Sequence, residues 1–275
     1  MVSMRPSSSR AARAALAAAL GLTFAGCVTP TVQQEEAIGD DFILDIRREM
    51  DLLTEPVVVG YIESIGRDIL RALPPQPFTY HFYVVEDEKI NAFAGPAGHV
   101  FVNTGTILKS RNLSELAGVI GHEIGHVAER HVAENVARQR TVGNLYKVTV
   151  YTAAIFGGQL GANAANLGGG LAAMGVLNTF GREAEREADT FAVEALVRAG
   201  IDPSGIVSFF ELLSREGGGG VPEFLSSHPA PEERVAATQA QVDLVDDRPG
   251  LRRTDGGKLE IIQRRIEILT RRRSR

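Results

Sequence analysis

The chain has 275 residues, of which 44% are apolar and 23% charged, and this composition predicts one globular domain with short additions. A formal net charge of −5 and a pI near 5.8 argue against a nucleic-acid-binding protein. The single cysteine, Cys27, excludes a disulfide within the chain.

Residues 1–26 have the features of a lipoprotein signal peptide. Three arginines precede an apolar stretch, residues 14–24, that is too short to span a bilayer as a stable helix. The sequence Phe-Ala-Gly-Cys at residues 24–27 then resembles a bacterial lipobox, so we expect a lipid on Cys27. Val28 follows the cysteine, which by resemblance to Gram-negative lipoproteins favours the periplasmic side of the outer membrane. An ordinary secretory signal or an apolar anchor is the alternative.

A tether and two helices are expected next. Residues 27–39 are polar and predict a tether to the domain, which we place at residues 40–245. Apolar residues recur at helical spacing in residues 40–50 and 56–73, and prolines end the second segment.

Three short stretches have the composition of strands. They are residues 79–85, 91–94 and 99–103, and they predict a small sheet that is antiparallel in part. His81 and His99 are expected to be strand residues, with His99 near a cleft.

The central helix is expected to run from Leu113 to about Arg138. Asn112 can cap it, with Glu115 as a capping-box partner. A further helix is expected at residues 145–156. Residues 148–180 contain too many glycines for a membrane span, and a mobile cover or a buried loop–helix pair is expected there.

The C-terminal part predicts several helices and a hinge. The expected helices are residues 181–199, 203–215 and 231–242, with a glycine hinge at 217–220. The tail, residues 246–275, ends in a basic amphipathic stretch. This stretch could lie on anionic lipid, but we favour a solvated helix or one that packs on the domain.

The sequence GHEIGHV in the central helix predicts a metal site. His122 and His126 lie one turn apart on one face, and Glu123 is rotated by about 100° from His122. The pattern H-E-x-x-H binds zinc in metalloproteases, with the glutamate as general base for a water molecule. Two exposed helix histidines are the alternative. Gly121 and Gly125 argue against it, because a surface helix does not need the close packing that glycines allow.

A third metal ligand is expected from the helix at residues 181–199. Glu183, Glu185 and Glu187 are candidates, and Glu185 has Asp189 four residues on. One of this pair can bind the metal while the other holds a ligand histidine, which favours Glu185 as ligand and Asp189 as its supporting residue. The alternative is that these acids only solvate the helix.

The motifs together resemble a known family. The sequences HEIGH, Glu-Arg-Glu-Ala-Asp (185–189) and H-P-x-P-x-x-R (228–234) resemble the HtpX and CAAX-prenyl-protease type of zinc metallopeptidase, as do residues 91–94 and 102–105. The resemblance spans roughly residues 50–240. It implies a gluzincin fold, mostly helical α+β with a small sheet beside the HExxH helix, and one zinc ion held by His122, His126 and Glu185. The chain is more similar to the periplasmic lipoprotein branch of this family, which includes BepA-like proteases, than to its integral-membrane members.

His228 and Arg234 belong to the last motif. His228 is expected either to stabilise an oxyanion or, in a resting state, to take the fourth metal position and exclude water. Arg234 is expected to orient this region or to contact substrate. A surface-loop histidine is the alternative for His228, and His131 is interpreted as a residue that does not bind the metal.

Residues 91–94 are the expected substrate-binding strand. The backbone of Asn91, Ala92, Phe93 and Ala94 would pair with an extended peptide, which suits unfolded clients because main-chain pairing depends little on side-chain identity. We therefore expect a lipid-anchored zinc endopeptidase for misfolded or misassembled envelope proteins, without nucleic-acid partners. The alternatives are a latched, chaperone-like lipoprotein that binds unfolded outer-membrane proteins, and a peptidase with one defined substrate.

Overall fold

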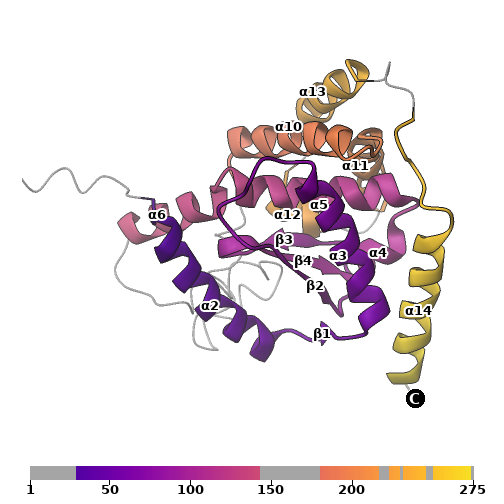
Figure 1. The fold of residues 1–275 in the computed structure, drawn as a ribbon, viewed down its shortest axis with the longest axis horizontal. Coiled ribbons are helices and arrows are strands. Elements are labelled where there is room, and N and C mark those ends of the chain that lie inside the picture. Colours follow the sequence, from indigo (N-terminus) through magenta and orange to yellow (C-terminus); the bar gives the residue numbers. More distant parts are fainter. Residues whose placement is uncertain (1–28, 143–179, 217–222, 230–231, 246–249, 274–275) are drawn as a thin grey trace, which may run out of the picture.

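The structure is a computed structural model that describes residues 29–142, 180–216, 223–229, 232–245 and 250–273 (Figure 1). The predictions for the signal peptide (1–26), Cys27, the helix at 145–156 and the hinge at 217–220 lie outside these residues. The expected cover at 148–180 also lies outside them, except for Phe180. Within the described ranges, every helix is too short or too polar to cross a bilayer.

Helices dominate the described residues, and the sheet is small. The helices are α2 (Val32–Glu49), α3 (Pro56–Arg71), α4 (Thr104–Lys109), α5 (Leu113–Ala128), α6 (His131–Val142), α10 (Arg182–Arg198), α11 (Ser204–Glu216), α12 (Glu223–Ser227), α13 (Glu232–Asp243) and α14 (Lys258–Arg273). The strands are β1 (Leu52–Leu53), β2 (His81–Val85), β3 (Ala92–Ala94) and β4 (His99–Asn103), and the turn η1 (Pro96–Gly98) joins the last two.

The four strands form one mixed sheet in the order β1-β2-β4-β3. Strands β2 and β4 are parallel, while β1 and β3 pair antiparallel with their neighbours. The sequence predicted every strand except β1, whose two residues are too few to show alternation. The prediction of a mostly helical α+β domain with a small sheet beside the HExxH helix is therefore confirmed.

The two faces of the sheet carry different helices (Figure 1). Alanines and valines of β3 and β4 point to α5 and join the main core with Leu116, Ile120 and Ile124. Phe93 and Phe101 point to the other face, where Phe42 and Ile46 of α2 cover them. His99 belongs to this second face and contacts the Tyr83 hydroxyl through Nδ1 at 3.2 Å. It therefore lies on the side of the sheet away from α5, and the expectation that it lies near the active cleft is wrong.

Helices α10 and α11 pack on α5, and α13 lies outside α10 (Figure 1). The glycines of α5 make this packing close. A Cβ on Gly125 would lie 3.1 Å from Ala188 Cα, and a Cβ on Gly121 would lie 3.5 Å from the Ala192 Cβ. The prediction that these glycines serve close packing is confirmed, and the contact brings α10 directly over the two HExxH histidines.

Two segments differ from the sequence predictions, and a third agrees with them. Helix α2 begins at Val32, not at residue 40, because Thr31 forms a capping box with Gln34, so most of the expected tether is helical. The expected helix from Leu113 to Arg138 is divided between α5 and α6, because Arg130 adopts a left-handed conformation with φ 59°. Helix α14 packs against α3 and α4, which agrees with the favoured interpretation of the basic tail.

Candidate metal centre

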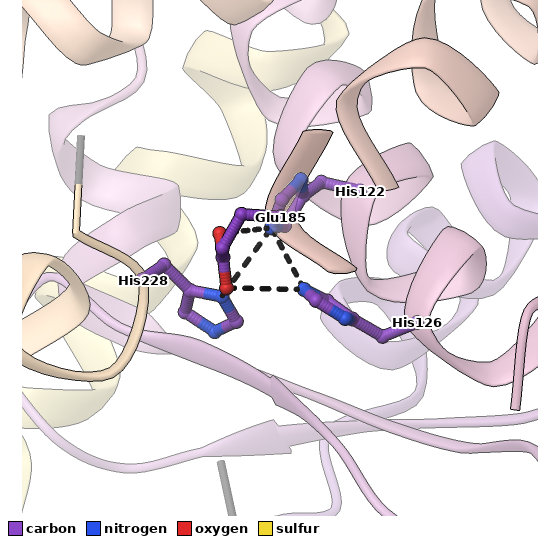
Figure 2. A group of neighbouring side chains, drawn as sticks. All are labelled: His122, His126, Glu185 and His228. Atoms are coloured by element: carbon purple, nitrogen blue, oxygen red, sulfur yellow. Dashed lines mark hydrogen bonds and ion pairs between the residues drawn. The ribbon is translucent and has the colours of Figure 1, made fainter. Parts of the chain in front are cut away.

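Four buried side chains converge between α5 and α10 (Figure 2). They are His122, His126, Glu185 and His228, and one donor atom from each lies within 4.8 Å of the others. The Nε2 atoms of His122 and His126 are 3.1 Å apart. Glu185 Oε1 lies 3.6 Å from His126 Nε2, and Glu185 Oε2 lies 3.5 Å from His122 Nε2. The structure thus places three imidazoles and a carboxylate around one point.

Each of these side chains has a local reason for its position. His122 and His126 share a face of α5 because residues four apart are one above the other on a helix. Glu185 lies in the first turn of α10. The short helix α12 positions His228, whose backbone N–H donates to the Phe224 carbonyl at 2.8 Å and whose ring stacks on Phe224. His228 Nδ1 then lies 3.0 Å from Glu185 Oε1.

A buried arginine holds the two carboxylates of α10. Arg234 donates to both oxygens of Asp189, at 2.6 and 2.8 Å, and its Nη1 lies 2.6 Å from Glu185 Oε2. Asp189 Oδ1 is also 2.9 Å from His122 Nδ1. Arg234 is only 4% exposed and its guanidinium is fully engaged. The expectation that Arg234 contacts substrate is therefore not supported, and it fits the alternative of an orienting residue.

The charges of the site are strongly coupled. Burial disfavours the protonated form of His122, but its contacts with Asp189 and Glu185 prevail and raise its pKa to about 9. Burial also opposes ionisation of Glu185 and Asp189, yet their positively charged neighbours lower the pKa of both carboxyls. The two buried carboxylates therefore make the site favourable for a positive charge, which a bound metal ion would supply.

Glu123 is completely buried beside this group. Burial raises the pKa of its carboxyl, while the charges of His228 and His122 act in the opposite direction. His228 Nε2 lies 3.6 Å from Glu123 Oε1, too far for a hydrogen bond. Neither oxygen accepts a well-aligned hydrogen bond from the described part of the chain. A buried carboxylate of this kind needs a partner such as a water molecule.

The donor set fits a zinc ion. Zinc binds imidazole and carboxylate ligands in a four-coordinate arrangement, and a catalytic site keeps one position open. His122, His126 and Glu185 supply three such ligands, and His228 lies where a fourth would stand.

Strand β3 lies at the edge of the sheet next to α5. The backbone of Asn91 is already used, because its N–H donates to Thr106 and its carbonyl accepts from Asn103. Gly95 likewise donates to the His99 carbonyl. Since antiparallel pairing alternates, Phe93 bonds to β4, while the backbone groups of Ala92 and Ala94 face the outer edge. Of the four residues expected to bind substrate, these two have their backbone directed outward.

Sequence reasoning missed two residues that contact His126, and a third that contacts one of them. The Phe180 ring stacks on its imidazole with centroids 3.8 Å apart. His131 Nδ1 lies 3.0 Å from His126 Nδ1, and His131 Nε2 lies 2.9 Å from Glu187 Oε2. On a continuous helix, His131 would point away from His126. The left-handed conformation of Arg130 ends this helix and brings the two rings together. No motif in the sequence signals this contact.

Comparisons with known proteins point to a metallopeptidase. The sequence model of peptidase family M48 matches residues 58–242. The beta-barrel assembly-enhancing protease of Yersinia pestis is 31% identical over 80% of this chain and 46% of its own length. The mitochondrial metalloendopeptidase OMA1 of Arabidopsis thaliana is 30% identical over 78% of this chain and 39% of its own. Metalloprotease LoiP of Escherichia coli is 34% identical over 58% of this chain and 61% of its own. The match thus spans less than half of the length of the first two relatives.

Proposed function

The chain belongs to peptidase family M48, and from this membership we propose that it is a zinc-dependent endopeptidase. The family confirms the predicted enzyme class, a metallopeptidase that hydrolyses peptide bonds. The observation that carries the proposal is the position of Glu123, a buried carboxylate that accepts no well-aligned hydrogen bond from the described residues, beside His122, His126 and Glu185.

The proposed mechanism assigns a role to each side chain. His122, His126 and Glu185 would hold zinc, which when bound lowers the pKa of a water molecule and polarises the scissile carbonyl. Glu123 takes the proton of the attacking water and later gives it to the leaving amine. Asp189 Oδ1 lies 2.9 Å from His122 Nδ1, so a proton on Nδ1 would face this carboxylate and leave Nε2 for the metal.

The outer edge of β3 is the proposed substrate site. The outward-facing backbone groups of Ala92 and Ala94 can pair with an extended peptide and bring its main chain to the metal ligands on α5, with the Ala94 backbone already next to the Glu123 carboxylate. Such pairing favours an unfolded segment in the substrate, because most backbone groups of a folded protein are already paired. The proposed substrates are therefore misfolded proteins with exposed chain segments.

The cell envelope is the proposed place of action. Two observations support it: the sequence Phe-Ala-Gly-Cys at residues 24–27, which resembles a lipobox, and relatives about 31% identical that are named for the assembly of beta-barrels. We place the chain on the periplasmic side of the outer membrane, anchored by lipid, where misassembled envelope proteins would be its clients. A peptidase with a single defined substrate is the narrower form of the same proposal.

The position of His228 is compatible with two functions: a peptidase with a closed resting state, and a protein that only binds its clients. Its Nδ1 atom lies in the group of metal-binding atoms, so the ring would occupy the position of the attacking water. This geometry favours a resting state in which His228 closes the site. A protein that remained in this state would bind unfolded outer-membrane proteins with little turnover, which is the chaperone-like alternative.

Removal of the metal tests the central proposal. We expect the zinc-loaded full chain, purified in detergent, to cleave casein, and we expect a zinc chelator to stop cleavage because Glu123 alone cannot activate water. Casein fragments are measured on gels, and added zinc should restore them. Cleavage that persists in the chelator would contradict a zinc peptidase.

Replacement of His228 tests the closed state. We expect His228→Ala to increase casein cleavage by roughly tenfold if the closed state is favoured by about ten to one. Initial rates are compared with those of Ser226→Ala, an exposed neighbour. A lower rate would indicate an oxyanion role in place of gating. An unchanged rate would exclude both roles, and inactivity of the wild type and of both variants would favour the chaperone-like alternative.

A further inference from the structure

Behind His126, on the side away from the metal-binding atoms, lies a pair of residues, His131 and Glu187. Helix α5 ends at Ala128, and Arg130 adopts the left-handed conformation that begins a new direction of the chain. His131, the first residue of α6, is thereby brought to His126, five residues before it. It is 2% exposed, whereas the Glu187 side chain from α10 is 51% exposed.

The contacts of this pair fit one arrangement of protons. With Glu187 as the acceptor, the 2.9 Å contact places a proton on His131 Nε2. In the neutral form of His131, Nδ1 then carries a lone pair and accepts. The 3.0 Å contact between the two Nδ1 atoms would in that form place the proton on His126 Nδ1. His126 Nε2 is left with its lone pair directed at the metal-binding group.

The other metal-binding histidine of α5, His122, also has an acidic residue on its Nδ1 side. Asp189 Oδ1 lies 2.9 Å from His122 Nδ1, while Glu187 reaches His126 only through one additional imidazole. We propose that Glu187 and His131 are positioning residues that fix the tautomer and ring orientation of His126 for metal binding. This inference rests on the proposed zinc site, in which His126 is a ligand.

A purely structural role for His131 is the competing explanation. His131 begins α6 and is packed near Phe180, with ring centroids 6.1 Å apart, so its removal could simply loosen this region. That role predicts a loss of stability in the metal-free chain and no selective effect on zinc. The positioning role predicts weaker zinc binding and a changed proton position on His126. Glu187 separates the two roles, because its half-exposed side chain contributes little to packing.

Zinc affinity is the first measurement. The full chain is titrated with zinc against a chromophoric chelator. We expect His131→Ala to weaken zinc binding by about 10–100-fold and Glu187→Ala by about tenfold, in line with the loss of residues that orient metal-binding histidines. Glu187→Gln keeps an acceptor oxygen and should restore most of the affinity. Glu194→Ala, two turns further along α10 with a 63% exposed side chain, is the matched control and should bind like the wild type.

The second measurement needs no metal. In the zinc-free chain labelled with ¹⁵N-histidine, long-range ¹H–¹⁵N correlation spectra at neutral pH show which ring nitrogen carries the proton. We expect His126 to be protonated at Nδ1 in the wild type and to become a mixture of tautomers in Glu187→Ala. A wild-type His126 protonated at Nε2, or variants with unchanged zinc affinity, would overturn the inference. A wild type that has this tautomer but binds no zinc would instead overturn the proposed zinc site.

Discussion

Glu123→Gln is expected to reduce the rate of casein cleavage by about 10²–10⁴-fold, the usual contribution of a general base. Glutamine has the shape of glutamate but cannot take a proton from water. Zinc affinity should remain near that of the wild type, because Glu123 is rotated away from the two histidines and is not among the four clustered donors. Cleavage rates and chelator competition measure the two effects separately.

The loss of activity should not come from unfolding. Burial raises the pKa of Glu123, so the ionised carboxylate at neutral pH is less favourable in the folded chain than in the unfolded one. Its contribution to stability is present at low pH and falls as the pH rises, and glutamine removes this unfavourable charge. Glu123→Gln should therefore unfold at the same denaturant concentration as the wild type, or at a higher one.

A matched buried glutamate provides the control. Glu115 lies on the same helix and is fully buried, but its carboxylate binds Arg111 and Ser208. Glu115→Gln should therefore keep its cleavage rate even if its stability falls. A zinc-loaded Glu123→Gln that cleaves casein at the wild-type rate would exclude Glu123 as the base.

Arg234→Met is expected to destabilise the metal-free chain by about 3–5 kcal/mol, the usual cost of leaving buried charges without their partner. Arg234 forms two hydrogen bonds to Asp189 and an ion pair with Glu185, and all three side chains are nearly inaccessible to solvent. Methionine fills part of the volume but leaves two carboxylates beside each other without this cation. Urea unfolding in the presence of a chelator measures the loss without a contribution from bound zinc.

An exposed arginine provides the comparison for this variant. Arg182 forms an ion pair with Glu233, with the two side chains 82% and 72% exposed, and such pairs contribute little. Arg182→Met should therefore leave the unfolding midpoint almost unchanged. If Arg234→Met is no more destabilising than Arg182→Met, then Arg234 is not needed to balance the buried carboxylates, and its proposed orienting role fails.

Local spacing was sufficient to predict the elements and part of the site. A strand of alternating residues or a helix with apolar residues three and four apart depends on neighbours in the sequence, so β2, β4, α3 and α13 lie close to their predicted bounds. The pairing of His122 with His126 and of Glu185 with Asp189 also follows from one helical turn. The glycines of α5 indicated close packing before the identity of the partner helix was known.

The arrangement of distant residues was decided only by the tertiary structure. His228 reaches the metal-binding group through α12, a five-residue helix that is too short for a periodic pattern. Arg234 contacts Asp189 and Glu185 because α13 packs against α10. His131 faces His126 because one residue, Arg130, leaves the helical conformation. The sequence by itself therefore determined which side chains could do the chemistry, since that depends on residue type and local spacing. Which of these side chains come into contact depends on long-range packing. A local sequence pattern contains no information about that packing.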